Sequence, residues 1–171
     1  DNVSIEDYLL MIEYKTAVLV GASLRMGAIV AETSAACKSA IYQYGRLLGI
    51  AFQLQDDYLD AFGDPATFGK QPGGDIIENK KTFLYLKSLE LASPGEARQL
   101  EHLYSISPME NTGKIEAVKN LFESSGAAEL TRKEIEKYTD MAFEVLDRID
   151  MPEEKKKPLR SFGKMLMERQ V

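Results

Sequence analysis

A stripe of large, mostly apolar side chains runs along residues 34–62 at steps of three and four. Its members are Ile41, Tyr44, Leu48, Phe52, Gln55 and Leu59. Steps of this size bring side chains to one face of an α-helix, which turns once every 3.6 residues or so. We therefore predict one long helix ending near Phe62, with Thr33 or Ser34 as its N-cap.

The rest of the chain also favours helices. Ser4 and Asp7 resemble a capping box and predict a helix that continues to about Leu19. The segment 93–96, Ser-Pro-Gly-Glu, is a capping box with proline at the first helical position. Further helices are predicted at residues 24–32, 80–91, 112–124, 127–149 and 159–170. No run alternates apolar and polar residues as a strand would, so the predicted class is all-α.

One segment interrupts this helical pattern. Residues 63–79 contain four glycines and two prolines, which is the strongest loop signal in the chain. A loop of this length inside a compact domain is usually functional or disordered. The chain has 171 residues, enough for one ordinary domain with its own core. We predict a single all-helical domain over residues 1–171.

Composition excludes several classes of protein. The net charge of -6 argues against a nucleic-acid partner, because binding phosphates needs a basic face. Cys37 is the only cysteine, which excludes an internal disulfide and thiolate metal sites and fits a reducing cytoplasm. His102 is the only histidine, so the chain cannot form a metal site from several histidines. No stretch approaches the roughly 20 apolar residues of a membrane span, so we expect none.

Acidic side chains gather near the end of the predicted long helix. Helical rotation places Asp56 and Asp60 one above the other, with Asp57 beside them. Stacked like charges repel, and aspartate is a poor residue for a helix interior. A divalent cation would relieve the repulsion, and carboxylate oxygens with water suit Mg²⁺. The alternative is a solvated acidic helix end.

The same face continues toward the start of the helix through Gln53, Phe52, Gly49 and Gly45. The two glycines would leave room beside the helix for an apolar ligand tail. Acidic residues at the entrance of such a space would suit a ligand with an anionic head group and a hydrocarbon tail. Alternatively, the glycines only allow another helix to pack closely.

Lysines lie around this acidic face. Lys70 and Asp75 belong to the glycine-rich loop, and Lys80 opens the next predicted helix. Ammonium groups facing a carboxylate–metal cluster are what a diphosphate needs, because its oxygens remain partly charged after metal binding. The alternative is a surface loop with ordinary lysines. Lys15-Thr16, further upstream, is uninformative alone.

Taken together, these blocks resemble the trans-prenyltransferase (polyprenyl synthetase) family. Its second aspartate-rich motif, Phe-Gln-x-x-Asp-Asp-x-x-Asp, stands at residues 52–60. The family's Gly-Asp and Gly-Lys-x-x-Gly-x-Asp-Ile follow as 63–64 and 69–76. Its upstream Lys-Thr matches Lys15-Thr16, and its later lysine best matches Lys80. The four blocks keep their order over residues 5–86.

This resemblance implies an antiparallel helical bundle around a central cavity, of the isoprenoid synthase type, in a cytoplasmic homodimer. It implies that Asp56 binds Mg²⁺ and that Asp57, Asp60 and Asp75 complete the metal site. Lys15, Lys70 and Lys80 would contact the diphosphate of an allylic substrate. Thr16 and Gln53 would place oxygen dipoles near the developing carbocation, and Gly45, Gly49 and Phe52 would line the space for the prenyl tail.

The implied reaction joins an allylic diphosphate (dimethylallyl, geranyl or farnesyl) to isopentenyl diphosphate. The products are a longer trans-prenyl diphosphate and pyrophosphate, in isoprenoid biosynthesis. The family also needs a first aspartate-rich motif, which this sequence lacks. We therefore expect the chain to be the C-terminal half of such an enzyme, preceded by the other half, and to be inactive alone.

Two other functions remain open at this point. A class I terpene cyclase shares the ionisation chemistry, but usually carries an Asn-Ser/Thr-Glu metal motif in place of a second Asp-Asp-x-x-Asp. A non-catalytic prenyltransferase-like subunit would bind a partner and turn over no substrate. The retained acids and lysines argue against that subunit, because a scaffold has no use for a costly acidic cluster.

Overall fold

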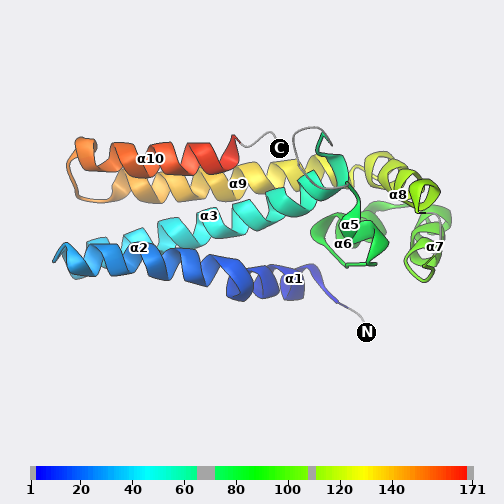
Figure 1. Cartoon of the computed structure of the whole chain (residues 1–171), viewed down its shortest axis with the longest axis horizontal. Coiled ribbons are helices and arrows are strands. Elements are labelled where there is room, and N and C mark those ends of the chain that lie inside the picture. Colours follow the sequence, from blue (N-terminus) through cyan, green and yellow to red (C-terminus); the bar gives the residue numbers. More distant parts are fainter. Residues whose placement is uncertain (1–2, 65–71, 108–110, 169–171) are drawn as a thin grey trace. The chain divides into compact units, whose positions relative to one another are not determined.

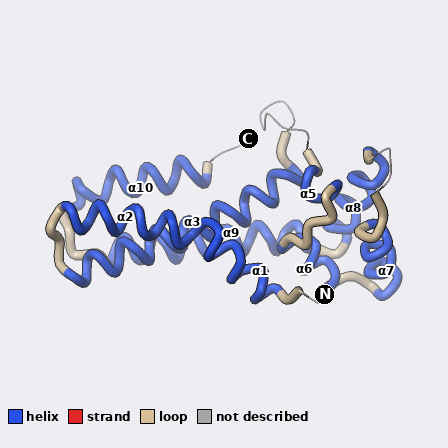
Figure 2. Tube along the Cα trace, turned by 60° about the horizontal axis from the view of Figure 1, so that its bottom comes forward, coloured by secondary structure: helices blue, strands red, loops and turns tan. Residues whose placement is uncertain are grey.

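The computed structural model describes residues 3–64, 72–107 and 111–168. Within these ranges every regular element is a helix, and Figure 2 shows helices and loops but no strand there. The all-α prediction is confirmed. In the same residues, no helix combines the length and apolar character that a membrane crossing requires.

The described residues fall into two compact units, which we treat separately. The first unit comprises 3–8, 54–64, 72–107 and 111–133, and the second comprises 9–53 and 134–168. The prediction of a single domain stays a prediction.

The second unit contains the longest helices of the chain. Its elements are α1 (Ile5–Ile12), the π-helix η1 (Glu13–Ala17), α2 (Val18–Val30), α3 (Ala35–Phe62), α9 (Ala127–Arg148) and α10 (Glu153–Met167), of which α1, α3 and α9 also enter the first unit. Figure 1 shows α2, α3, α9 and α10 running alongside one another. Tyr44, Leu48 and Leu146 form the centre of the core between α3 and α9. The Tyr44 hydroxyl donates to the Leu159 carbonyl of α10 at 2.6 Å.

The first unit consists of shorter helices. They are α5 (Gly74–Ile77), α6 (Phe83–Leu91), α7 (Pro94–Leu103) and α8 (Thr112–Ser124). Helix α8 contacts the other three. The core takes Leu84 from α6, Leu100 from α7 and Phe122 from α8, each almost fully buried. Helix α8 begins and ends where the sequence predicted.

Three predicted helix starts are confirmed by their caps. The Ser34 hydroxyl accepts the amide hydrogen of Cys37 at 3.1 Å, so Ser34 caps α3. Ser93 and Glu96 form the complete reciprocal capping box of α7. Ser4 and Asp7 do the same for α1, with hydrogen bonds of 3.0 and 3.1 Å.

Other boundaries differ from the prediction. The predicted break between residues 19 and 24 is absent, because α2 continues directly from the π-helix. Helix α10 begins at Glu153, before Pro158. Pro158 has no amide hydrogen to donate, yet α10 continues through it to Met167. The predicted helix 80–91 begins only at Phe83, and the short α5 lies inside the predicted loop.

The π-helix follows from the spacing of buried residues. Tyr8, Ile12, Ala17 and Gly21 are all buried, at steps of four, five and four. In a regular α-helix, a step of five residues from Ile12 would point Ala17 away from the face that holds the other buried residues. The wider turn keeps Ala17 in line, with the amide of Val18 donating to the Glu13 carbonyl five residues back.

Glycines permit a very close contact between this segment and α3. A Cβ atom on Gly49 would lie 2.5 Å from Ala17 Cα, and one on Gly45 would lie 2.9 Å from Gly21 Cα. A Cβ on Gly21 would lie 2.8 Å from the Tyr42 carbonyl oxygen. Because the nearest atoms include backbone, no side-chain movement can make room. Only glycine fits at these positions.

We expect Gly49→Ala to lower the free energy of unfolding by about 1–3 kcal/mol, as overpacking does. The matched control is Gly27→Ala in α2, where nothing lies within 4 Å of the added methyl group. That control should raise stability by about 0.5–1 kcal/mol, because glycine is a poor helix residue. Urea unfolding of both variants measures the difference. Equal effects would mean that α3 and the π-helix do not approach this closely.

Candidate functional site

The acidic face predicted from the sequence lies at the end of α3. Asp56, Asp57 and Asp60 are all half-buried there, and all three belong to the first unit. Asp57 and Asp60 contact different neighbours, one on α1 and one at the start of α5. The acids are therefore part of a packed region and not a solvated helix end.

Asp57 faces a buried tyrosine of α1. The Tyr8 hydroxyl donates to Asp57 Oδ2 at 2.5 Å, and only 2% of Tyr8 is exposed. Burial raises the pKa of the Tyr8 phenol, and the charge of Asp57 raises it further. The phenol therefore keeps its proton and orients one oxygen of Asp57. The Tyr8 ring is fixed in turn against Phe83, with ring centroids 6.3 Å apart.

Asp60 contacts the start of α5. The Asp75 amide donates to Asp60 Oδ2 at 2.9 Å, and the Gly73 amide donates to the Asp60 carbonyl at 2.6 Å. A Cβ atom on Gly74 would lie 3.2 Å from Asp60 Oδ1. The glycine pair thus lets the chain turn back onto the end of α3. It brings Asp75 next to Asp60, as the sequence predicted for the metal site.

The carboxylates of this region disfavour one another's charge. Burial raises the pKa of the Asp60 carboxyl, and the charges of Asp75 and Asp56 contribute in the same direction. The Asp75 amide and the Lys80 ammonium oppose this rise only in part. An ionised Asp60 is thus held in a place that would favour a nearby cation.

Lys80 is paired with acids of its own segment. Its ammonium lies 2.7 Å from Asp75 Oδ1 and 2.8 Å from Glu78 Oε2, and these hydrogen bonds raise the pKa of Lys80. Half of the lysine side chain, 53%, remains exposed. The residue predicted to bind diphosphate and one of the predicted metal ligands are therefore each other's partners here.

The second unit holds the predicted Lys-Thr pair and Gln53. The Thr16 hydroxyl donates to Gln53 Oε1 at 3.0 Å, and both side chains are half-buried. Lys15, in the same π-helix, is exposed. The hydroxyl hydrogen of Thr16 is directed at Gln53, so its lone pairs are directed elsewhere. Lys70 lies outside the described residues.

The glycine stripe has a packing role in this unit. The π-helix and α2 fill the space beside Gly49 and Gly45, through Ala17 and Gly21. Close helix packing, the alternative to a space for a ligand tail, accounts for both glycines. Phe52, on the same helix, is half-buried.

The donors available for a metal ion are carboxylate oxygens. Within residues 3–64, 72–107 and 111–168, no three Asp, Glu, His or Cys side chains form a group that could hold a metal ion. Mg²⁺ commonly uses only one or two protein carboxylates and takes its other ligands from water and substrate phosphates. The adjacent Asp60 and Asp75 fit a cation of that kind, which binds together with an anion.

Two contacts that matter for this site were not predicted from the sequence. Tyr8 and Asp57 are 49 residues apart, so no local pattern could pair them. Arg46, which binds Glu13 of the π-helix at 2.6 Å, was also missed. Its spacing was a usable signal, because Arg46, Gly49 and Gln53 share one face of α3.

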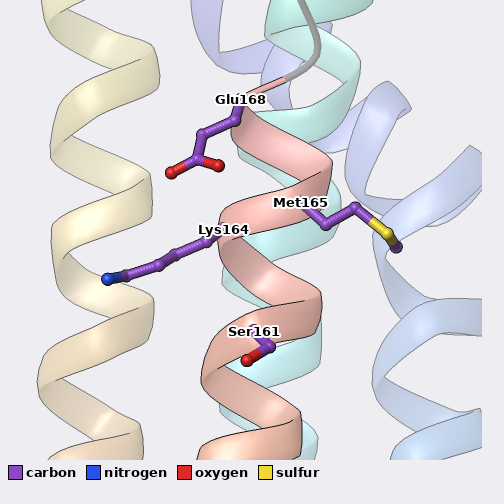
Figure 3. Close-up of a pocket in the computed structure, with 4 residues that line it drawn as sticks. All are labelled: Ser161, Lys164, Met165 and Glu168. Atoms are coloured by element: carbon purple, nitrogen blue, oxygen red, sulfur yellow. The ribbon is translucent and has the colours of Figure 1, made fainter.

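A separate hollow lies on α10, in the second unit. Ser161, Lys164, Met165 and Glu168 line it, and its volume is about 440 Å³ (Figure 3). Three of the side chains come from α10 and the fourth, Glu168, directly follows it; all four residues are exposed. None of the predicted site residues that the structure describes lines this hollow.

Comparison with known proteins gives one consistent result. The sequence profile described as polyprenyl synthetase matches residues 1–122. A short chain isoprenyl diphosphate synthase of Methanothermobacter thermautotrophicus is 36% identical over 149 residues, which is 87% of this chain and 45% of that protein. A geranylfarnesyl diphosphate synthase of Natronomonas pharaonis is 34% identical over 170 residues, 98% of this chain and 47% of that protein.

Solved structures agree with this result. A crystal structure of a geranylgeranyl pyrophosphate synthase has a TM-score of 0.92 and 48% identity, covering 100% of this chain and 53% of that one. The crystal structure of the Corynebacterium glutamicum geranylgeranyl pyrophosphate synthase is a complex with isoprenyl diphosphate and magnesium. It has a TM-score of 0.88 and 33% identity, and the match covers 98% of this chain and 48% of that one. This chain thus spans about half the length of the relatives that it matches.

We expect Asp60→Asn to raise the midpoint of urea unfolding in buffer with EDTA at pH 7. The fold raises the pKa of Asp60, so its ionised form lowers stability above that pKa. Asparagine can still accept the Asp75 amide hydrogen but carries no charge. The gain should shrink as the pH falls toward the raised pKa, where Asp60 itself becomes neutral.

The control is Asp140→Asn, an exposed acid of α9. Its midpoint should stay close to that of the unmodified protein at every pH. A lower midpoint for Asp60→Asn than for this control would contradict the assignment of electrostatic repulsion to Asp60.

Proposed function

The chain belongs to the polyprenyl synthetase family, and on that premise we propose that the whole protein is a trans-prenyl diphosphate synthase. It would join an allylic diphosphate (dimethylallyl, geranyl or farnesyl) to isopentenyl diphosphate and release pyrophosphate. The observation that carries this proposal is the set of half-buried acids at the end of α3, with Asp75 hydrogen-bonded to Asp60. A neutral or apolar ligand would have no use for carboxylates that disfavour one another's charge.

We propose Mg²⁺ as the metal, bound directly by Asp56, with Asp57, Asp60 and Asp75 holding metal-bound water or completing its coordination. When bound, it would neutralise the diphosphate oxygens and make the diphosphate a better leaving group. Oxygen-only donors support this choice, as does the Corynebacterium relative, whose crystal structure is a complex with isoprenyl diphosphate and magnesium. Tyr8 orients Asp57, and the Asp75 amide orients Asp60.

Lysines would bind the diphosphate that these acids and Mg²⁺ receive. We assign this role to Lys15, Lys70 and Lys80. The Lys80 ammonium holds Asp75 and Glu78 by its own hydrogen bonds, and half of its side chain is exposed to solvent. A phosphate oxygen could therefore replace Glu78 as the second partner of Lys80.

Thr16 and Gln53 would act on the hydrocarbon end of the substrate. The Thr16 hydroxyl gives its hydrogen to Gln53 and keeps its lone pairs for another partner. Oxygen lone pairs stabilise positive charge that develops when the allylic C–O bond breaks. We place the prenyl tail against Phe52, while Gly45 and Gly49 contribute by admitting α2 and the π-helix.

We also propose that the protein is a homodimer and cytoplasmic. Seven large apolar side chains of residues 10–30 are at least half exposed: Leu10, Met11, Tyr14, Leu19, Met26, Ile29 and Val30. Large apolar side chains exposed along one segment support a surface that a partner covers. Cys37, the only cysteine, is free and buried, which suits a reducing compartment.

The direct test is turnover by the whole protein, given dimethylallyl and isopentenyl diphosphates with Mg²⁺. We expect a longer prenyl diphosphate and pyrophosphate, and no product after EDTA treatment. Asp56→Ala should lower kcat about 100-fold or more, because a positioned charge that acts in the transition state is lost. Circular dichroism should stay unchanged.

Asp140→Ala serves as the matched control and should keep full activity. A cyclised or linear hydrocarbon product would instead indicate a terpene cyclase. Substrate binding without any product would indicate a non-catalytic subunit.

Tyr8→Phe tests the metal assignment without an activity assay. We expect the affinity for Mg²⁺ with inorganic pyrophosphate, measured by calorimetry, to fall about 10-fold, as for other residues that orient a metal ligand. Tyr44→Phe is the control, since it also removes one buried hydroxyl, here the donor to the Leu159 carbonyl. If both variants weakened binding equally, Tyr8 would have no special relation to the metal.

A further inference from the structure

One ion pair fastens the π-helix to α3. Arg46 donates from Nε to Glu13 Oε1 at 2.6 Å and from Nη2 to Glu13 Oε2 at 2.7 Å. Two parallel hydrogen bonds fix orientation as well as distance, which a lysine could not do. The side chains are 29% and 22% exposed, so water screens this pair less than a surface pair.

Other groups support the pair in place. Arg46 Nη1 also donates to Gln43 Oε1 at 3.3 Å. The bond from Arg46 lowers the pKa of Glu13 and keeps it ionised. The guanidinium thus binds Glu13 of the π-helix and Gln43 of its own helix at the same time.

Glu13 belongs to the turn itself. Its carbonyl accepts the Val18 amide hydrogen, the bond that makes this turn a π-helix, while its carboxylate reaches α3. At the other end of the turn, Ala17 lies against Gly49. Lys15 and Thr16 lie between these two attachments. The backbone of both residues is therefore held at each end by neighbouring residues, in addition to the hydrogen bond from Thr16 to Gln53.

A π-turn of this kind needs such attachments. It carries one residue more than an α-turn, and such turns are rare and occur singly within α-helices, so we expect an isolated helix to revert to α. Reversion would rotate the residues on one side of the turn by about 100° relative to the other. Thr16 would then lose its alignment with Gln53.

We propose that Glu13 and Arg46 are positioning residues for the reaction. They hold the π-helix in the register that directs the Lys15 ammonium and the Thr16 hydroxyl at the ionising substrate. Neither residue contacts substrate in this assignment. The inference rests on the proposed function, and it adds two residues that the family motifs do not contain.

The test compares Glu13→Gln and Arg46→Lys with Asp147→Asn in the whole protein. Asp147 forms a 2.6 Å ion pair with Arg160 between α9 and α10, in the same unit but on other elements. We expect kcat to fall about 10- to 100-fold in the first two variants, as for a misplaced catalytic group. The KM for isopentenyl diphosphate should change less than about twofold. Asp147→Asn should keep kcat within about twofold of the unmodified protein.

Amide hydrogen exchange provides a readout that needs no turnover. Amides of residues 13–18 should exchange faster in Glu13→Gln and Arg46→Lys, while those of α9 and α10 stay unchanged. Losses of kcat no larger than in Asp147→Asn, with unchanged exchange at residues 13–18, would overturn the inference. An unmodified protein without turnover would overturn the proposed function instead, and the exchange data would still decide whether the pair holds the turn.

Discussion

The contact between Ala17 and Gly49 is the constraint on which the second unit depends. An added Cβ atom on Gly49 would lie 2.5 Å from Ala17 Cα, so the two backbones are too close for any side chain at position 49. Ala17 reaches this place only because the preceding turn has five residues instead of four. The unusual turn and the glycine thus require each other. Gly21 and Gly45 repeat the close contact one helical turn further along.

The first unit follows a different rule, set by charge. Asp60 is kept half-buried beside Asp75, and burial together with the neighbouring acids raises its pKa. The fold compensates locally, with the Asp75 amide on one oxygen and Lys80 on Asp75. Natural proteins carry charges that lower stability mainly at functional sites, which agrees with the role proposed for these acids. Close backbone packing thus accounts for Gly45 and Gly49 in α3. Charge accounts for the contacts of Asp60 near the end of the same helix.

Local chemistry made much of the fold predictable. Ser34 and Ser93 cap helices as their side chains dictate, and α8 follows its apolar spacing. The acidic stripe of α3 was also correctly placed on a helix. The π-helix was not predictable, because the steps from Ile12 to Ala17 and Gly21 have meaning only once the partner helix is known. Likewise, the Tyr8 contact with Asp57 joins segments that only folding brings together.

The two glycines of α3 show how a pattern can have a cause other than its first interpretation. Each glycine in a helix costs about 1 kcal/mol relative to alanine, so a reason for its presence is needed. A ligand tail would be one reason, but an adjacent backbone is sufficient, and both glycines have one. An anionic ligand is therefore inferred independently of the glycines. The acids support a cation, because the Asp75 amide and Lys80 offset their mutual repulsion only in part. The anion is inferred through that cation and the neighbouring lysines.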